Sequence, residues 1–432
     1  MGTNWRTVAV GDAFDVNPYR AIKRGQVTPF IPMDALPEHT RTVSRVDERE
    51  FTGSGTKFQN GDTLIARITP CLENGKTAFV AGLPAGVVAH GSTEYIVLAG
   101  KPNQSDSLFA YYLARSPDFR RYAIGHMEGT SGRQRVPSVA VQNFLVSLPS
   151  LPEQRAIAHI LGTLDDKIEL NRRMNETLEA MARALFQSWF VDFDPIRAKM
   201  EGHWRKGESL PGLPAHLYDL FPDSFEESEL GEIPRGWKVQ GLDEIANFLN
   251  GLALQKYSPG DGATLPVIKI AQLRKGDTEG ADRCNTSVPP KYVINDGDVL
   301  FSWSGSLECI LWAGDRGALN QHLFKVTSTQ FCKWFYYLWV HEHLASFRHT
   351  AAGKATTMGH IQRHHLSDAK VVVPESDVLD AVDKMIAPII EQIMQRRIES
   401  RTLATLRDML LPKLISGELR VAHPKTLAEA RQ

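Results

Sequence analysis

Several short segments resemble parts of catalytic motifs, but each lacks a residue that the chemistry requires. Residues 17–19 resemble the Asn-Pro-Pro-Tyr motif that positions an exocyclic amine for methyl transfer, yet the second proline is missing. Residues 75–77 match the end of a phosphate-binding loop, but Pro70 stands where the first glycine belongs. His341 and His343 are one residue closer than the spacing that binds zinc on a helix. The sequence therefore predicts no catalytic, cofactor or metal site on this chain.

Two polar loops carry the side chains that proteins use to read DNA. Residues 129–135 and 353–360 occupy equivalent places in a repeated pattern but hold different side chains. Arginine and lysine contact phosphates and guanine, glutamine suits adenine, and serine or threonine contacts the DNA backbone. This predicts one scaffold that reads two different sequences, with an ordinary surface loop as the alternative. The candidate DNA-binding residues are Lys23, Arg24, Arg67, Lys76, Thr130, Ser131, Arg133, Gln134, Arg135, Gln255, Lys256, Trp303, Ser304, Lys354, Thr356, Thr357, His360 and Arg363.

The composition is that of a folded protein with more than one domain. The chain has 432 residues, of which 42% are hydrophobic and 23% charged, which argues against disorder and collagen-like repeats. No apolar run is long enough to span a bilayer, and the first residues lack a signal-peptide pattern, so we expect a cytoplasmic protein without a membrane segment. The net charge of −1 neither requires nor excludes nucleic acid. The four cysteines lie too far apart for a disulfide framework or a zinc knuckle.

The chain contains two unequal copies of one pattern, and this repeat decides the architecture. A turn that opens an apolar strand appears at residues 59–65 and again at 295–301. An aromatic helix appears at 109–113 and again at 334–338, an offset of 225 residues that then stays constant. Each copy is therefore expected to be a mixed α/β domain followed by a long helix.

The two long helices carry apolar residues at alternating spacings of three and four, which predicts a heptad seam. Neither helix can bury its seam alone, so we expect the two to pair in antiparallel orientation. Gly162 and Pro388 predict a kink at nearly equivalent places. The seam positions are Leu161, Leu164, Ile168, Asn171, Asn175, Leu178, Leu185 and Trp189 in the first helix, and Ile386, Ile389, Ile393, Arg396, Ser400, Leu403, Leu410 and Leu414 in the second.

The expected fold is α+β, with two α/β domains separated by a long antiparallel helical spacer and related by a pseudo-twofold internal repeat. The polar positions of the two seams should face one another near the middle of the spacer. The expected segments are a first domain at 1–150, a first helical region at 151–195, a proline-rich linker at 196–235, a second domain at 236–374, a second helical region at 375–420 and a tail at 421–432.

Five strings of sequence resemble the specificity (S) subunits of type I restriction-modification systems. Residues 151–157, running into 164–171 and then 186–195, resemble the first conserved helical region of these subunits. Residues 229–237 resemble the beginning of their second recognition domain, and 406–419 resemble the end of their second conserved helix.

The resemblance implies two target recognition domains, each binding one half of a split double-stranded DNA sequence. It also implies two methyltransferase subunits that modify adenine and restriction subunits that translocate and cleave DNA. S-adenosylmethionine, ATP and magnesium would then be bound by those partners, and this chain would carry no catalysis. Residues 374–377 depart from the family pattern at the start of the second helix, so partner contacts there are expected to differ.

A helix of about 38 residues, rising about 1.5 Å each, spans about 57 Å, which limits the half-site centres to about 16 base pairs apart. We therefore expect a bipartite target with a fixed gap of several base pairs. The alternatives are a self-contained methyltransferase or nuclease, and a coiled-coil scaffold that reads no DNA.

Overall fold

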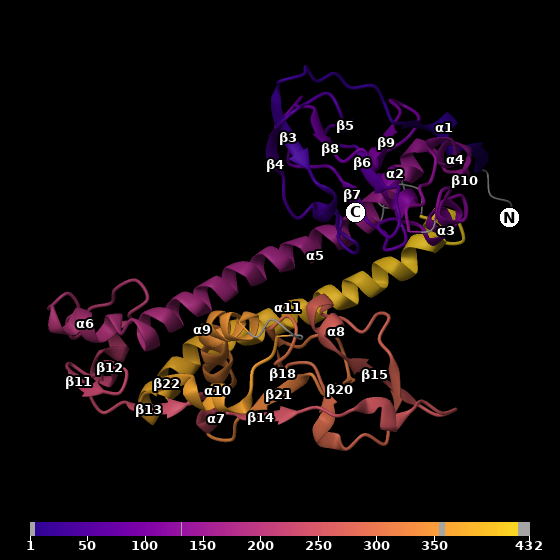
Figure 1. Ribbon diagram of the computed structural model, residues 1–432. Helices are drawn as coiled ribbons and strands as arrows, with labels where there is room; N and C mark the ends of the chain where they lie inside the picture. Colours follow the sequence, from indigo (N-terminus) through magenta and orange to yellow (C-terminus); the bar gives the residue numbers. More distant parts are fainter. Residues whose placement is uncertain (1–4, 131, 354–358, 422–432) are drawn as a thin grey trace, which may run out of the picture. The chain divides into compact units, whose positions relative to one another are not determined.

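The computed structural model describes residues 5–130, 132–353 and 359–421, and Figure 1 shows the elements along the chain. The chain divides into two compact units. Unit 1 comprises Met1–Leu170 and Thr402–Gln432, and unit 2 comprises Asn171–Arg401. Each unit contains one α/β domain and part of each long helix.

The α/β domain of unit 1 contains two four-stranded sheets. Its elements are β1 (Arg6–Ala9), α1 (Val10–Ala13), β2 (Phe14–Val16), β3 (Val27–Ile31), η1 (Met33–Ala35), β4 (Asp47–Glu50), β5 (Thr56–Phe58), β6 (Thr63–Ala66), β7 (Thr77–Phe79), β8 (Ala89–Gly91), β9 (Tyr95–Gly100), α2 (Ser107–Arg115), α3 (Pro117–Gly125), α4 (Ser138–Asn143) and β10 (Leu145–Leu148). One sheet is antiparallel with the order β2-β9-β6-β7. The other has the order β4-β3-β8-β5 and a parallel β3-β8 pair, while β1 pairs with β10.

The α/β domain of unit 2 repeats this topology. Its elements are β13 (Lys238–Gly241), α7 (Leu242–Ile245), β14 (Asn247–Asn250), η4 (Leu254–Tyr257), β15 (Thr264–Ile268), α8 (Ile270–Lys275), β16 (Arg283–Asn285), η5 (Pro290–Tyr292), β17 (Val293–Ile294), β18 (Val299–Ser302), β19 (Cys309–Leu311), β20 (Gly317–Leu319), β21 (Leu323–Thr327), α9 (Lys333–Ala352), α10 (Arg363–Asp368) and β22 (Lys370–Val373). The sheet orders are β14-β21-β18-β19 and β16-β15-β20-β17, with a parallel β15-β20 pair, and β13 pairs with β22. The predicted internal repeat is therefore confirmed strand by strand.

The turns before β6 and β18 show why the repeated sequence gives a repeated fold. Gly61 and Gly297 have φ angles of +89° and +88°, a region in which glycine lacks the steric penalty of other residues. The next residue closes each turn: Asp62 Oδ2 accepts the Gln59 N–H at 2.9 Å, and Asp298 Oδ2 accepts the Asn295 N–H at 2.8 Å. The following strands are fully buried.

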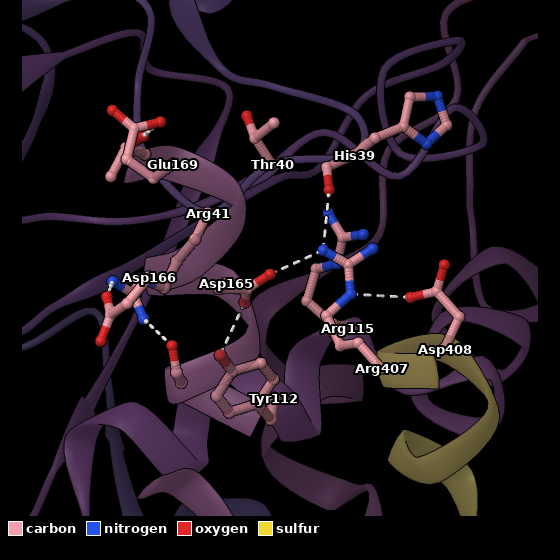
Figure 2. A network of polar contacts seen from close by, with 12 residues as sticks. His39, Thr40, Arg41, Tyr112, Arg115, Asp165, Asp166, Glu169, Arg407 and Asp408 are labelled. Carbon is pink, nitrogen blue, oxygen red and sulfur yellow. Dashed lines mark hydrogen bonds and ion pairs between the residues drawn. The ribbon is translucent and has the colours of Figure 1, made fainter. Parts of the chain in front are cut away.

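The long helices α5 (Leu151–Phe186) and α11 (Ser376–Ser416) pack in antiparallel orientation within unit 1. Leu161 and Leu414 are buried in the same apolar cluster, together with aromatic residues of α2. Further along, Asp165 and Arg407 form a buried ion pair that Tyr112 also joins (Figure 2). Lower residue numbers on α5 thus meet higher numbers on α11.

Within unit 2 the same two helices are again antiparallel. Asn171 contacts Ser400, and Asn175 contacts the backbone carbonyl of Ile393. The backbone carbonyl of Arg396 accepts a hydrogen bond from Asn171, and the Arg396 guanidinium donates one to the Gln392 side chain. The predicted central polar layer is therefore present, with Asn171 opposite Ser400.

The buried stripe of the helices drifts away from a strict heptad. Leu164 and Leu410 are only half-buried, whereas their neighbours Asp165 and Leu411 are buried. An α-helix has 3.6 residues per turn, so a pattern with a period of 3.5 rotates off the contact line over several turns. Both helices continue through Gly162 and Pro388, so neither residue ends its helix.

The segment predicted as a linker is packed into unit 2. It follows η2 (Gln187–Val191), begins within α6 (Asp194–Met200) and contains η3 (Ala215–Leu220), β11 (Phe225–Ser228) and β12 (Gly231–Pro234). Trp204 and Phe221 are buried and contact each other, and Phe221 also contacts Trp237. Its buried aromatic side chains belong to the main apolar cluster of unit 2, so the segment is part of the core of that unit.

Two further expectations concern membranes and cysteines. Among the described residues, no helix has both the length and the apolar character that crossing a bilayer requires. All four cysteines are free thiols, and Cys284 and Cys309 are buried.

Candidate nucleic-acid interface

Three chain segments meet in the same way in the two α/β domains. In unit 1, the Arg67 N–H donates to the Glu94 carbonyl at 2.9 Å, and the Val136 N–H donates to the Arg67 carbonyl at 2.9 Å. An isolated bridge also links Ile68 to Arg135. The side chains of Arg67, Glu94 and Arg135 therefore stand at one junction, which we call the charged junction.

Unit 2 forms the equivalent junction with different side chains. The Trp303 N–H donates to the His322 carbonyl at 3.3 Å, and the Ile361 N–H donates to the Trp303 carbonyl at 3.0 Å. A bridge links Ser304 to His360. Trp303, His322 and His360 thus replace Arg67, Glu94 and Arg135, and we call this set the aromatic junction.

At the charged junction, Glu94 holds the polar loop in place. Arg135 donates from Nε to both Glu94 oxygens at 2.9 Å and from NH2 to Oε1 at 2.7 Å. Its NH1 donates to the Arg133 carbonyl at 3.2 Å. The hydrogen bonds from Arg135 hold the pKa of the Glu94 carboxyl below its usual value. Arg135 is therefore engaged within the domain, and Arg67 Nε is buried without a hydrogen-bond partner.

The neighbouring loop residues present their side chains outward. The Gln134 backbone is fixed on both sides by Thr69, since the Thr69 N–H donates to the Gln134 carbonyl at 3.0 Å and the Gln134 N–H donates to Thr69 Oγ1 at 3.1 Å. Arg133 is exposed and Gln134 is half-buried. Within the described part of the chain, their side chains form no hydrogen bond or ion pair, which leaves both available to a ligand.

The remaining candidate DNA-binding residues of unit 1 lie at different positions in the domain. Thr130 is exposed and its carbonyl accepts the Arg133 N–H at 3.0 Å, within the same loop. Lys76 Nζ donates to the Met33 carbonyl at 3.2 Å, which uses one of its hydrogens inside the domain. Lys23 and Arg24 are exposed in the connection between β2 and β3, and no contact among the described residues links their side chains to the charged junction.

At the aromatic junction, the indole of Trp303 is fixed at its edge. Trp303 Nε1 donates to Asn250 Oδ1 at 2.9 Å and to the Gln321 carbonyl at 3.1 Å. Ser304 Oγ and His322 Nδ1 are hydrogen bonded at 3.1 Å. The Trp303 ring lies 5.7 Å from the His322 ring and remains half-buried. An anchored, partly open indole with amide and imidazole neighbours offers both an apolar surface and polar groups.

The other candidates of unit 2 do not all join this junction. Arg363 NH2 donates to the Phe248 carbonyl at 3.3 Å. Phe248 belongs to β14 and is not part of the aromatic junction. Gln255 and Lys256 are exposed on η4, which packs against the β16-β15-β20-β17 sheet. Ser131, Lys354, Thr356 and Thr357 lie outside the described residues.

Sequence reasoning missed Glu94 and His322, as well as Asn250 and Gln321. Glu94 and His322 each stand directly before the strand that follows the parallel pair. A three-residue polar connection between two buried strands, at 92–94 and at 320–322, is the sequence signal that could have found them.

Residues 3–180 and 234–407 match the family described as the type I restriction modification DNA specificity domain. The chain belongs to this family. It is 24% identical over 468 residues to the type I restriction enzyme HindI specificity subunit of Haemophilus influenzae, which covers 96% of this chain and 100% of that protein. It is 30% identical to the type I restriction enzyme EcoEI specificity subunit of Escherichia coli, over 70% of this chain and 61% of that protein.

The fold agrees with the family. A crystal structure of a type I restriction-modification system S subunit from M. genitalium aligns with a TM-score of 0.51 at 14% identity, covering 95% of this chain and 96% of the other. The predicted membership of the specificity family and the predicted two-domain α+β fold with helical regions are confirmed. The predicted assignment to a non-catalytic recognition subunit also agrees with this family, because the relatives are specificity subunits.

Proposed function

We propose that this chain is the specificity subunit of a type I restriction-modification complex, in which each α/β domain reads one half of a bipartite double-stranded DNA target. The observation that carries the proposal is the pair of equivalent junctions with different side chains. Two domains with one backbone frame and two side-chain sets suit two different half-sites. Such a subunit works on DNA inside the cell, so a cytoplasmic location follows from the proposal.

In the first domain, Arg133 and Gln134 are the proposed base-reading side chains. Arginine forms bidentate contacts with guanine and glutamine with adenine. Arg135 has the different role of a positioning residue, because its donors are engaged by Glu94 and the Arg133 carbonyl. In the second domain we assign reading to the region of Trp303, His322 and His360.

The helices are proposed to set the distance between half-sites and to bind two methyltransferase subunits, with restriction subunits joining that assembly. Several large apolar side chains of the helices are exposed. Met174 and Met181 lie seven residues apart on α5 and are 37% and 49% exposed, while Leu406 and Met409 on α11 are 44% and 60% exposed. Exposed apolar side chains at helical spacing suit a helical partner. S-adenosylmethionine, ATP and magnesium belong to those partners.

The test uses the chain assembled with its methyltransferase subunits. Sequencing of methylated adenines in the host genome returns the two half-sites and the gap between them. Affinity is then measured for targets altered in one half at a time, with Arg133→Ala and Gln134→Ala. We expect a loss of about 1 to 3 kcal/mol that is confined to one half-site, as for a lost bidentate contact.

Arg121→Ala is the matched control, because Arg121 is an exposed arginine of the same domain that pairs with Asp118 three residues earlier. It should leave both half-sites unchanged. Equal losses at both half-sites would contradict the assignment. An assembly with no DNA affinity would favour a scaffold without DNA reading instead.

A further inference from the structure

Unit 2 contains a groove of about 640 Å³ between α11 and the beginning of α9. One wall is the α11 surface that includes Ala387 and Glu391, and the other includes Lys333 and Trp334. Trp334 Nε1 donates to Asp383 Oδ1 at 2.8 Å, which joins the α9 wall to the α11 wall. Three carboxylates border the groove, from Asp296, Asp383 and Glu391. Arg401 pairs with Asp296 at 2.7 Å and Trp334 donates to Asp383, which leaves Glu391 as the carboxylate of the groove available to a ligand.

Unit 1 fills the equivalent place with its own chain. The repeat offset of 225 residues pairs Leu108, Gly162 and Asp166 with Lys333, Ala387 and Glu391. Arg41 donates to the Gly162 carbonyl at 3.5 Å and forms an ion pair with Asp166. A Cβ at Gly162 would lie 3.1 Å from Leu108 Cδ2 and 3.6 Å from Arg41 NH1, so the arginine is seated against the helix at this point.

Hydrogen bonds to three of its backbone carbonyls hold the loop that carries Arg41 against the domain. The Thr77 N–H donates to the Pro37 carbonyl at 3.2 Å, and the Phe79 N–H donates to the Arg41 carbonyl at 3.0 Å. Tyr111 Oη donates to the Thr40 carbonyl at 3.4 Å. In unit 1 the occupant of the site is therefore a loop without helix or strand that brings one arginine to a carboxylate on the helix.

Unit 2 lacks such a loop. The connection between η1 and β4 covers residues 36–46, whereas the equivalent connection between α8 and β16 covers only 276–282. No residue of 276–282 lines the groove. The edge of β19 is held by α11 instead, because Arg397 NH1 donates to the Leu311 carbonyl at 2.8 Å. Glu391 is exposed and has no hydrogen bond or ion pair within the described residues.

We propose that this groove receives an extended segment of a methyltransferase subunit and that an arginine of this segment pairs with Glu391. The inference rests on the proposed function, because that function supplies the partner. Two observations carry it: Glu391 lines the groove with no ion pair among the described residues, which complements an arginine, and unit 1 contains a filled version of the same site. The helix that forms one wall also carries the exposed Leu406 and Met409, at which the proposed function places a partner.

The test measures the affinity of the purified full-length chain for its methyltransferase subunit by calorimetric titration. Glu391→Lys reverses the proposed acceptor, and Ala387→Trp blocks the groove without a change of charge. We expect each variant to weaken one of two binding events by at least about tenfold. Glu232→Lys is the control, since Glu232 is an exposed carboxylate of unit 2 outside the groove.

A photo-crosslinking residue at Gln395, which also lines the groove, identifies the occupant. We expect an adduct with a methyltransferase segment that contains an arginine, and we expect replacement of that arginine by glutamate to restore binding to Glu391→Lys. Wild-type affinity of Glu391→Lys, or an adduct with a second copy of this chain, would overturn the inference while leaving the proposed function intact. If the wild-type chain bound no methyltransferase subunit, both would fail.

Discussion

Arg407 on α11 donates a hydrogen bond to Asp165 on α5 at 2.6 Å, and the two side chains are only 6% and 4% exposed within unit 1 (Figure 2). Tyr112 Oη donates to the other Asp165 oxygen at 2.6 Å. The repeat offset places Ile390 where Asp165 stands and Ala182 where Arg407 stands, and both are buried in the apolar cluster of unit 2. The same antiparallel contact is thus ionic in one unit and apolar in the other.

We expect Arg407→Ala to lower the free energy of unfolding of unit 1 by about 3 to 5 kcal/mol, because it leaves the Asp165 carboxylate buried without its cation. Asp165→Ile combined with Arg407→Ala and Tyr112→Phe should regain most of this loss, since it copies the apolar solution of unit 2 and removes the hydroxyl that donated to Asp165. Calorimetric melts of the full chain measure both effects. A triple variant as unstable as the single one would contradict this account.

The buried His341 in α9 should make the free energy of unfolding depend on pH. Burial of its ring, with the Arg183 guanidinium nearby, lowers the pKa of His341 to about 3. Arg183 NH2 donates to His341 Nδ1 at 3.3 Å, which requires the unprotonated nitrogen. Above about pH 6.5, histidine is neutral in the folded and the unfolded chain. Below it, the unfolded chain binds a proton that the folded chain does not, so stability falls as the pH decreases toward 3.

The expected slope is about 1 kcal/mol of unfolding free energy per pH unit between pH 6 and 4. His341→Gln keeps a side chain that can accept from Arg183 but does not titrate, and it should remove this slope. Denaturant unfolding at several pH values provides the measurement, with His216→Gln as a control at an exposed histidine of the same unit. An unchanged slope in His341→Gln would show that other groups cause the acid sensitivity.

The sequence predicted the repeat well because its signals are local. The glycine and aspartate of each turn before β6 and β18 determine the backbone there, whatever the rest of the chain does. The exact seam could not be predicted in the same way. Asp165 is charged, and nothing near it in sequence shows that Arg407 will neutralise it in the folded chain. The packed segment 196–235 was obscured by its prolines and acidic residues, although it contains Trp204 and Phe221.

In the candidate site, too, residues of one loop could be predicted from the sequence, whereas contacts between distant segments could not. Arg133 and Gln134 could be proposed from residue type alone, because they belong to one loop. Glu94 and His322 come from distant parts of the sequence and reach the junctions only through sheet formation. Arg135 looked like a reader in the sequence, and its engagement with Glu94 is visible only in the folded domain.

The polar layer of the helix pair should determine register at a cost in stability. Asn171 Nδ2 donates to Glu399 Oε2 at 2.7 Å and Asn175 Nδ2 donates to the Ile393 carbonyl at 3.3 Å, but both Oδ1 atoms are buried without a hydrogen-bond partner. Asn171→Leu with Asn175→Leu removes two unsatisfied oxygens, so we expect equal or higher stability.

The same double variant should tolerate more than one gap length in the DNA target. A slip of one heptad moves a domain about 10 Å along the helix axis, which is about three base pairs of duplex. Methylation assays on targets with lengthened and shortened gaps, together with thermal melts, test this expectation. Strict retention of one gap length would assign register to other contacts, such as the Asp165–Arg407 pair.

Glu94 should act as a positioning residue for one half-site. Glu94→Gln removes the charge that holds Arg135 and should let the loop at 128–135 move, because the carboxylate accepts from both Nε and NH2 of Arg135. We expect a loss of discrimination at the half-site that Arg133→Ala also affects, with no change at the other. His322→Gln in the second domain is the matched variant and should show the reverse pattern. Arg135 lowers the pKa of Glu94, so their ion pair stabilises the folded domain above the usual pKa of a glutamate. This stabilisation is lost as the pH falls through the lowered pKa. Binding to each half-site, measured for both variants at neutral pH, decides the assignment: if the two variants weakened the same half-site, the two junctions would not read separate halves.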